Sequence, residues 1–424
     1  MDHFIYRDGQ LYCQQVPVEE IVRQVGTPAY IYSLATLQTH YQRIAEAFAP
    51  LHPLICYSVK SCGNLAILAA LRACGSGFDV VSGGELFRAR RAGADPSKIV
   101  FAGVGKTDPE INDALDAGIG WFNIESEEEF WNLERLAAQK SIHTKAALRV
   151  NPDVTSHGTH VKTLTGKKDT KFGVDIDRAE EFYVQAAAAT HVRLNALHLH
   201  IGSPIKTPQP YVDAIGKALQ LIQRLRQRGI RVDTIDIGGG FAAFYEGNEA
   251  PPAEIYAAAI VPLLQNTGLK VLLEPGRSIS CNAGILVSRV QYVKQGGRRK
   301  FIIVDAAMND LIRPTLYESY HFIWPTAPTH PPASRLSTQR SPDDELVDVV
   351  GPICESGDYF AKDRYLPPLH RGDLLALFSA GAYGFAMSSQ YNARPRAVEI
   401  LVDGSNWRII RKRECYEDLI RGEE

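Results

Sequence analysis

The chain has 424 residues, of which 45% are hydrophobic, so it is long enough to bury a large core and to form two domains or a barrel with an appendage. Its 46 basic and 48 acidic residues are interspersed and leave a formal net charge of −2, which excludes the one-sided fields that attract nucleic acid or anionic membranes. No apolar run reaches the roughly 18 residues of a membrane span, and the start, Met1-Asp2-His3-Phe4, lacks a signal-peptide layout, so we expect a cytoplasmic protein that acts on small molecules.

The first 26 residues predict a β-hairpin. Phe4 to Arg7 and Gln10 to Cys13 are strand-like runs on either side of Asp8-Gly9, a dipeptide that favours a tight turn. We expect this hairpin to join the sheet of a β-rich domain that the C-terminal part of the chain also predicts.

Residues 27–280 alternate short apolar runs with stretches of helical apolar spacing. In the stretch before Gly75, for example, Ile67, Leu68 and Leu71 form one stripe, and the glycine follows as a C-cap. Eight strand-like runs are present: Leu54 to Val59, Phe78 to Ser82, Ile99 to Gly103, Gly120 to Glu125, Ala146 to Asn151, Asn195 to Gly202, Thr234 to Gly240 and Val271 to Gly276. Eight βα units predict an α/β fold, a (β/α)8 TIM barrel.

Barrel enzymes place their chemistry at the C-terminal ends of the strands, so unusual residues should gather there. In this sequence Lys60 follows the first run, Ser82-Gly83-Gly84-Glu85 the second, His200 ends the sixth, Gly238-Gly239-Gly240 the seventh and Glu274-Pro275-Gly276-Arg277 the eighth. We therefore expect the active site at this end of the barrel.

Residues 281–424 have a different rhythm, with strands and few helices between them. The strand-like runs are Lys300 to Asp305, Glu345 to Val350, Asp373 to Phe378, Ala397 to Val402 and Trp407 to Lys412. The last two flank Asp403-Gly404-Ser405-Asn406, which favours a hairpin turn. The Pro-rich stretch Trp324 to Ser341 predicts a long loop or flap. This part, together with residues 1–26, predicts a second, β-rich domain.

Residues at the barrel's strand ends match the needs of pyridoxal 5′-phosphate (PLP). A PLP enzyme requires a lysine for a Schiff base, donors for the phosphate, a partner for the pyridine nitrogen and a flat group against the ring. Lys60 fits the first need, and the glycines at 238–240 expose backbone N–H groups to a phosphate. Glu274 and His200 fit the other two. Read one at a time, the glycines equally suit a tight turn and Glu274 a structural salt bridge.

Metal, zinc and nucleotide sites find less support. His198 and His200 lie two residues apart on a strand, but no third ligand has a convincing spacing, so we predict no metal. The seven cysteines are odd in number and form no C-x-x-C pair, which argues against a disulfide framework. Gly105-Lys106-Thr107 lacks the first glycine of a P-loop, because Val100 stands at its position.

Cys354 is the cysteine that we single out for chemistry. It stands beside Glu355 in a turn-rich segment, Gly351 to Asp358. A decarboxylation leaves a carbanion that must be protonated, and a thiol with a polar neighbour suits that task. On its own, Cys354 is also compatible with an ordinary loop cysteine.

Together these residues resemble the PLP-dependent decarboxylases of the alanine-racemase-like fold, and within them the diaminopimelate decarboxylases. Family-like motifs occur in order over nearly the whole chain: Gly26-Thr27-Pro28, Tyr57-Ser58-Val59-Lys60, Asp79-Val80-Val81-Ser82-Gly83-Gly84-Glu85, Arg149-Val150-Asn151-Pro152, Lys171-Phe172-Gly173, His198-Leu199-His200-Ile201-Gly202-Ser203, Asp236-Ile237-Gly238-Gly239-Gly240, Glu274-Pro275-Gly276-Arg277, Cys354-Glu355-Ser356-Gly357-Asp358 and Tyr391-Asn392.

The resemblance implies a role for each matching residue. Lys60 would hold PLP as a Schiff base, His200 would stack on its ring and Glu274 would meet the pyridine nitrogen. The residues implied around the phosphate and the rest of the cofactor are Ser203, Gly239, Gly240, Gly276, Arg277 and Tyr383. Cys62, two residues after the lysine, departs from the family pattern, and we interpret it as a packing variant.

For the substrate, the resemblance implies meso-2,6-diaminopimelate, which would lose CO2 at its D-centre to give L-lysine in lysine biosynthesis. Arg277, Arg313, Tyr317 and Tyr383 would contact the substrate, and Glu355 would pair with its far ammonium group. Cys354 would be the acid. Because the family takes its Cys-Glu pair from the other subunit, an obligate homodimer with shared active sites is implied.

The expected substrate contacts distinguish a diaminopimelate decarboxylase from related decarboxylases. Diaminopimelate carries a second amino-acid head, which an Arg313 fork and the Glu355 carboxylate suit, whereas the related ornithine decarboxylases carry Asp after the cysteine. Two alternatives stay open from the sequence. One is a decarboxylase of carboxynorspermidine or a basic amino acid, and the other is a catalytically dead PLP-binding partner protein.

Overall fold

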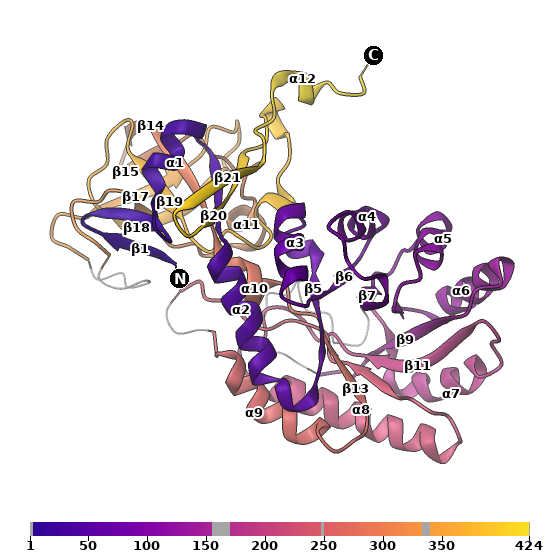
Figure 1. The fold of residues 1–424 in the computed structure, drawn as a ribbon. Helices are drawn as coiled ribbons and strands as arrows, with labels where there is room; N and C mark the ends of the chain where they lie inside the picture. Colours follow the sequence, from indigo (N-terminus) through magenta and orange to yellow (C-terminus); the bar gives the residue numbers. More distant parts are fainter. Residues whose placement is uncertain (1–2, 155–169, 247–249, 333–339, 424) are drawn as a thin grey trace. The chain divides into compact units, whose positions relative to one another are not determined.

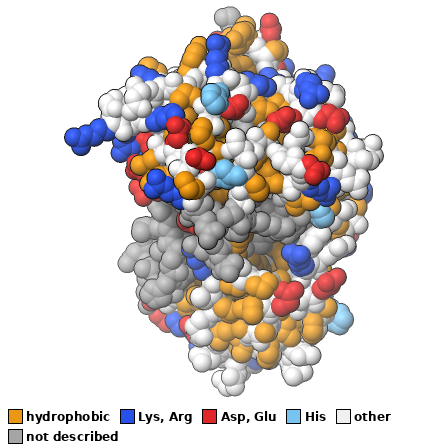
Figure 2. All heavy atoms as spheres, turned by 90° about the vertical axis from the view of Figure 1, so that its left-hand side faces the viewer, with side chains coloured by type: hydrophobic (Ala, Val, Ile, Leu, Met, Phe, Trp, Pro, Cys, Tyr) orange, Lys and Arg blue, Asp and Glu red, His pale blue; other side chains and the backbone are white. Residues whose placement is uncertain are grey.

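The computed structural model describes residues 3–154, 170–246, 250–332 and 340–423 (Figure 1). It divides into two compact units. The barrel unit comprises residues 41–242 and 250–278, and the β-rich unit comprises residues 1–40, 243–249 and 279–424. Among the described residues, no helix is both long and apolar enough to cross a membrane. On the face seen in Figure 2, basic and acidic side chains are intermixed.

The barrel unit contains the predicted closed parallel barrel, which confirms the fold class. Hydrogen bonds link the strands in the order β5-β6-β7-β8-β9-β11-β12-β13. The ring is closed because β13 in turn pairs with β5. The strands are β5 (Leu54–Ser58), β6 (Gly77–Val80), β7 (Ile99–Phe101), β8 (Trp121–Ile124), β9 (Thr144–Asn151), β11 (Val192–His198), β12 (Thr234–Asp236) and β13 (Lys270–Leu273). A two-residue strand, β10 (Val174–Asp175), also pairs with β9. Each strand lies within a predicted run or overlaps it, because a barrel strand is buried on both faces and reads as continuously apolar.

Helices follow the strands along the chain and lie outside them (Figure 1). They are α2 (Leu34–Ala47), α3 (Leu65–Ala73), α4 (Gly83–Arg91), α5 (Asp108–Ala117), α6 (Glu127–Lys140), α7 (Ile176–Ala186), α8 (Gln209–Gln227) and α9 (Ala253–Leu264). In α3, the side chain of Asn64 caps the first turn by accepting from the Ala66 N–H. The predicted stripe is buried, and Gly75 has a φ of +98° just after the C-cap, as its predicted role requires.

The β-rich unit is built on one large sheet. Its main order is β18-β17-β15-β14-β4-β20-β21, and β19 and β16 extend it from β14. The strands are β4 (Ala29–Ser33), β14 (Gly284–Gly296), β15 (Arg299–Val304), β16 (Ile323–Pro325), β17 (Glu345–Val350), β18 (Tyr359–Leu366), β19 (Leu374–Leu377), β20 (Val398–Asp403) and β21 (Asn406–Arg411). Short helices complete the chain: α1 (Val18–Val25), α10 (Arg277–Ser280), α11 (Arg313–Tyr317) and α12 (Tyr416–Leu419). The β-rich character and the β20–β21 hairpin are confirmed.

The N-terminal hairpin forms as predicted, but its expected place in the large sheet is wrong. β1 (Phe4–Arg7) and β2 (Gln10–Cys13) form a separate three-stranded sheet with β3 (Val16–Pro17). β2 pairs with β1 on one side and with β3 on the other, although the Leu11 N–H also donates to the Thr326 carbonyl, just after β16, at 2.7 Å. The strand that joins is β4, which runs parallel to β20 and antiparallel to β14. The β-rich unit therefore extends past residue 27, where the sequence placed the start of the barrel domain.

The predicted Pro-rich loop at 324–341 is only partly within the described residues. Its start belongs to strand β16, and residues 333–339 lie outside the described part of the chain. The expected flap thus stays a prediction.

Candidate active site

Lys60 stands in a short turn directly after β5, at the C-terminal end of that strand. Its Nζ donates a 2.9 Å hydrogen bond to Asp79 Oδ2, and Ser58 Oγ donates to the same oxygen at 2.7 Å. The Lys60 side chain is 33% exposed, whereas Asp79 is fully buried. Burial and the charge of Glu274 raise the pKa of Asp79, although Lys60 acts in the opposite sense. The amine is therefore both anchored inside the barrel and accessible from outside, as a Schiff-base lysine must be.

Cys62 follows in the same turn and is almost fully buried, with 3% of its surface exposed. Its carbonyl accepts a 3.2 Å hydrogen bond from the Tyr57 hydroxyl. These features agree with its interpretation as a packing residue.

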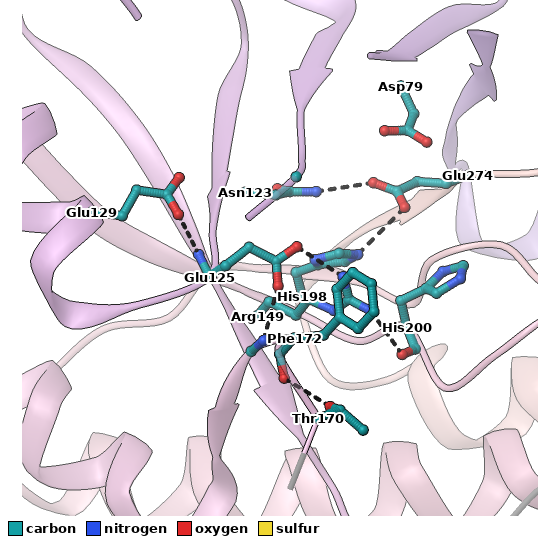
Figure 3. Close-up of polar contacts among 12 residues, drawn as sticks. Asp79, Asn123, Glu125, Glu129, Arg149, Thr170, Phe172, His198, His200 and Glu274 are labelled. Carbon is teal, nitrogen blue, oxygen red and sulfur yellow. Dashed lines mark hydrogen bonds and ion pairs between the residues drawn. The ribbon is translucent and has the colours of Figure 1, made fainter. Parts of the chain in front are cut away.

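Glu274, just after β13, lies in a buried group of polar side chains with Asn123 and His198 (Figure 3). Asp236 belongs to the same group. We call these four residues the polar cluster. Asn123 Nδ2 donates to Glu274 Oε1 at 2.9 Å, and His198 Nε2 lies 3.3 Å from Glu274 Oε2. Burial acts to raise the pKa of Glu274, but the charges of His198 and Lys60 outweigh it and hold this pKa well below its usual range. Glu274 is therefore an anion in the barrel interior.

His200, two residues after His198, contacts different groups (Figure 3). Its Nδ1 accepts a 3.5 Å hydrogen bond from the Gly239 N–H. Burial, with the charges of Arg149 and Lys60, lowers the pKa of His200 well below its ordinary value. The ring is thus a neutral, flat group, which suits packing against an aromatic cofactor better than ion pairing.

Arg149 accounts for two family-like motifs that had no assigned role from the sequence alone. Its Nη1 lies 2.8 Å from Glu125 Oε1, and its Nη2 donates to the His200 carbonyl at 3.3 Å. Its guanidinium also stacks 4.7 Å from the centroid of the Phe172 ring, while Glu125 Oε2 accepts from the Gly173 N–H. The motifs at 149 and 171–173 therefore fix the backbone of the candidate ring-stacking histidine.

The glycines after β12 are required by close backbone approach. A Cβ on Gly239 would lie 2.1 Å from the Glu274 carbonyl oxygen, and one on Gly240 would lie 2.3 Å from that of Gly202. Gly240 also has a φ of +98°, which disfavours other residues. Nearby, Arg277 Nε donates to Ser203 Oγ at 3.1 Å. N–H and hydroxyl donors therefore gather after β11, β12 and β13, as phosphate binding demands.

In the β-rich unit, Arg313 at the start of α11 is surrounded by tyrosine rings. Its guanidinium carbon lies 5.3 Å from the ring centroid of Tyr245, 5.8 Å from that of Tyr317 and 6.0 Å from that of Tyr383. Nη2 donates to Ser319 Oγ at 3.1 Å, whereas Nε is buried and finds no hydrogen-bond partner among the residues that the structure describes. A buried guanidinium with an unused donor is suited to a carboxylate ligand.

Cys354 and Glu355 lie on the exposed loop between β17 and β18. The Cys354 N–H donates to Asn392 Oδ1 at 3.2 Å, and the Tyr391 hydroxyl donates to Glu355 Oε2 at 2.7 Å. This hydrogen bond with Glu355 raises the pKa of the Tyr391 phenol. The Tyr391-Asn392 motif therefore holds the Cys354-Glu355 pair.

Further hydrogen bonds fix the loop that carries Cys354 and Glu355. The Asp358 carboxylate accepts from the N–H groups of Ile353 at 2.6 Å and Met308 at 2.7 Å. Thr315, on helix α11, donates its hydroxyl to the Gly357 carbonyl. Within the β-rich unit, the helix that carries Arg313 thus adjoins the loop that carries Cys354.

Comparison with known proteins decides the family. Residues 34–281 match the family described as pyridoxal-dependent decarboxylase, pyridoxal binding domain. The chain belongs to the pyridoxal-dependent decarboxylases. The decarboxylase is 44% identical to diaminopimelate decarboxylase from Pseudomonas aeruginosa, over 100% of this chain and 99% of that protein.

Solved structures of the same family are similar over nearly the whole chain. Diaminopimelate decarboxylase from Helicobacter pylori, complexed with L-lysine, has 39% identity and a TM-score of 0.88, and the match covers 95% of this chain and 98% of that one. The enzyme from M. jannaschii, also with L-lysine, has 33% identity and a TM-score of 0.92, with 100% and 98% covered. The predictions of a decarboxylase, of PLP and of an amino-acid substrate are confirmed.

The residues of this decarboxylase fit PLP. Bound PLP supplies an electron sink for the carbanion that loss of CO2 leaves. The residues of the barrel unit that would hold it are Lys60 with an accessible amine, Glu274 with a buried anion and His200 with a neutral ring. The glycine-rich strand ends leave room for a phosphate.

The structure groups the predicted site residues by unit. Within the barrel unit, those at the C-terminal strand ends are Lys60, His200, Ser203, Gly239, Gly240, Glu274, Gly276 and Arg277. Within the β-rich unit, Arg313, Tyr317 and Tyr383 share one cluster, and Cys354 and Glu355 share one loop.

Sequence reasoning missed several residues of these groups. Asp79, Asn123 and Asp236 are polar residues inside otherwise apolar strand runs, a signal that was available but not used. Asp236 and Glu274 also stand beside His198, for which the sequence offered no third ligand. Tyr245 gave no such local signal, because it meets Arg313 only through the fold.

Proposed function

We propose that this chain is a diaminopimelate decarboxylase, which removes the D-centre carboxylate of meso-2,6-diaminopimelate and yields L-lysine and CO2. The names of its relatives support this, since proteins about as long as this chain and 42–44% identical to it carry that name. The two L-lysine complexes among similar structures agree with lysine as the product.

The observation that carries the proposal is the environment of Arg313. Lysine and ornithine have no carboxylate at the far end of the side chain, whereas diaminopimelate has one. A buried guanidinium with an unpartnered Nε, packed among three tyrosines, is an unfavourable arrangement unless an anion pairs with it. Arg313 therefore binds the distal carboxylate, with Tyr317 and Tyr383 beside it.

The cofactor residues have distinct tasks in this proposal. Lys60 bonds to PLP, His200 packs on its ring and Glu274 meets the pyridine nitrogen. The phosphate is held by the backbone and side-chain donors of Ser203, Gly239, Gly240, Gly276 and Arg277. Tyr383 contacts both cofactor and substrate, and Arg277 also meets the substrate. No metal takes part.

Cys354 and Glu355 complete the set. The thiol donates the proton that replaces CO2, and the Glu355 carboxylate pairs with the distal ammonium. Their loop is exposed on the chain but fixed by several hydrogen bonds, as expected of residues that serve a second copy. We therefore propose a homodimer in which each subunit supplies this pair to its partner. A cytoplasmic location stays a prediction of the sequence.

The test is a substrate panel with the purified PLP-loaded protein. CO2 release is measured from meso-diaminopimelate, its L,L and D,D isomers, ornithine, L-lysine, arginine and carboxynorspermidine. The proposal expects release from the meso isomer, with an Arg313→Leu variant losing this activity far more than its PLP. Preferred turnover of carboxynorspermidine or a basic amino acid would instead assign another substrate, and a PLP-free protein would favour a non-catalytic role.

A further inference from the structure

Two carboxyl groups of the polar cluster, those of Asp236 and Glu274, lie side by side in the barrel interior. Asp236 is 1% exposed and Glu274 is 3% exposed. The Asn123 amide bridges them, since Nδ2 donates to Glu274 Oε1 at 2.9 Å and to Asp236 Oδ2 at 3.3 Å. Two full negative charges this close and this buried repel each other strongly.

One carboxyl oxygen of Asp236 and one of Glu274 lie within 4.8 Å of each other, and protonation of either group relieves their repulsion. An ionised carboxylate can only accept, so a hydrogen bond between two carboxyl groups requires a proton on one of them. We propose that Asp236 and Glu274 share a single proton carried by Asp236, so that Asp236 is a positioning residue that holds Glu274 in its anionic form.

The surrounding groups decide which carboxyl keeps the proton. His198 Nε2 lies 3.3 Å from Glu274 Oε2, and Lys60 also acts on Glu274, so the positive charges favour the glutamate anion. Asp236 accepts from the Gly238 N–H at 2.9 Å, and among the described residues it forms no ion pair, whereas Glu274 pairs with His198. Burial and the charge of Glu274 raise the pKa of Asp236 well above its usual value. Cys56, Asp79 and His200 also interact electrostatically with members of the pair.

This inference rests on the role proposed for Glu274 at the pyridine nitrogen. A glutamate anion there must point one oxygen at the cofactor while its other contacts are held in place. The Asp236 hydroxyl on β12 and the Asn123 amide on β8 supply those contacts without adding a second negative charge. Asp236 thereby strengthens PLP binding without touching PLP.

A divalent cation is the rival occupant of this cluster, since one ligand atom each of His198, Asp236 and Glu274 lie within 4.8 Å of one another. The two readings differ in the charge that they require of Asp236. A metal needs an ionised aspartate, whereas the shared proton needs a neutral one. Asparagine resembles the neutral acid, because it keeps one acceptor and one donor.

The first test compares Asp236→Asn and Asp236→Ala by the dissociation constant of PLP, measured by dialysis of the full chain. Alanine removes a hydrogen bond to a charged group, and the expected loss of PLP affinity is about 10- to 100-fold. The Asp236→Asn variant should keep most of the PLP affinity that Asp236→Ala loses. Asp233→Asn, three residues earlier and partly exposed, is the matched control and leaves PLP affinity unchanged. Equal losses in both Asp236 variants, or one divalent metal ion per parent chain that Asp236→Asn lacks, would overturn the proposal.

The second test does not require the alanine variant to fold. The infrared spectrum of the parent protein should contain the carbonyl band of a protonated carboxyl group, which shifts on ¹³C labelling of aspartate and disappears in Asp236→Asn. A parent spectrum without such a band at neutral pH would overturn the proposal. Neither readout uses diaminopimelate, so a failure of the proposed substrate would leave both results interpretable.

Discussion

Tyr391 donates a 2.7 Å hydrogen bond to Glu355, and its neighbour Asn392 accepts one from the Cys354 N–H. Tyr391 and its neighbour Asn392 thus hold the consecutive residues Glu355 and Cys354, which lie 36 and 38 positions earlier in the chain. Asn392 has a φ of +56°, a left-handed conformation that asparagine tolerates better than most residues. The pair with the proposed acid and ammonium-binding roles is therefore held by a local clamp.

Replacing Tyr391 with Phe removes the hydroxyl from this clamp and keeps the ring. Glu355 then samples more orientations, so we expect KM for meso-diaminopimelate to rise a few-fold and kcat to change less. Steady-state kinetics measures both. Tyr416→Phe, on the exposed helix α12, is the control. An unchanged KM in Tyr391→Phe would show that the clamp does not position Glu355 for the substrate.

Gly239→Ala should be severely damaging, because the added Cβ would lie 2.1 Å from the Glu274 carbonyl oxygen. The ends of β12 and β13 would have to separate, and we expect PLP binding to be lost together with several kcal/mol, of order 3–5, of stability. Gly216→Ala in α8 is the matched control, since its Cβ meets nothing within 4 Å. It should stabilise the chain by about 0.8–1 kcal/mol through helix propensity. Urea unfolding and PLP absorbance measure these effects, and near-parental behaviour of Gly239→Ala would contradict the account of the close strand ends.

Glu85 makes stability depend on pH. Burial raises the pKa of its carboxyl to about 7 from an ordinary 4.5, even though the Val81 N–H donates to it. Because the folded pKa is raised, its contribution is fully present below about pH 4.5 and is lost as pH rises through about 7.

Glu85→Gln removes that dependence and keeps an acceptor for Val81. Relative to the parent, the variant should gain stability between about pH 4.5 and 7 by roughly 1 kcal/mol per pH unit. Chemical denaturation at several pH values measures the difference, with the exposed Glu128→Gln as control. A constant difference across this range would contradict the raised pKa.

His200 should give the pH dependence of stability the opposite slope from Glu85. Its pKa is lowered in the folded state by burial, so the unfolded chain binds a proton near pH 6.5 that the folded chain refuses. The stability that this group contributes is present above about pH 6.5 and lost as pH falls below it. His200→Phe, which keeps a flat ring, should therefore lose less stability than the parent between about pH 6.5 and 5. The exposed His370→Gln is the control, and parallel pH curves for His200→Phe and the parent would rule out a neutral buried ring.

The sequence predicted most of the barrel because its strands are buried on both faces. Runs such as Leu54 to Tyr57 are therefore mostly apolar and stand out between helical stretches. The same property misplaced β4: Ala29–Ser33 is also fully buried, but in the sheet of the β-rich unit. A buried strand does not reveal in which sheet it lies.

The site was predicted where a residue stands at a strand end or in a motif, as Lys60 and Glu274 do. It was not predicted where contacts depend on barrel closure. Asn123 and Asp236 belong to strands 113 residues apart, yet they are hydrogen-bonded. Tyr391 needs the fold of the β-rich unit to reach Glu355. Such partners follow from three-dimensional closure and carry no local spacing.

The central claim is that this chain converts meso-diaminopimelate to L-lysine and CO2 with a cofactor held by Lys60. The most direct measurement incubates the PLP-loaded protein and its Lys60→Ala variant with meso-diaminopimelate and quantifies lysine and CO2 together. The account predicts equal amounts of lysine and CO2 from the parent, and neither product from Lys60→Ala, whose visible PLP absorbance is also lost. Undiminished decarboxylation by Lys60→Ala, or no lysine from the PLP-loaded parent, would contradict it.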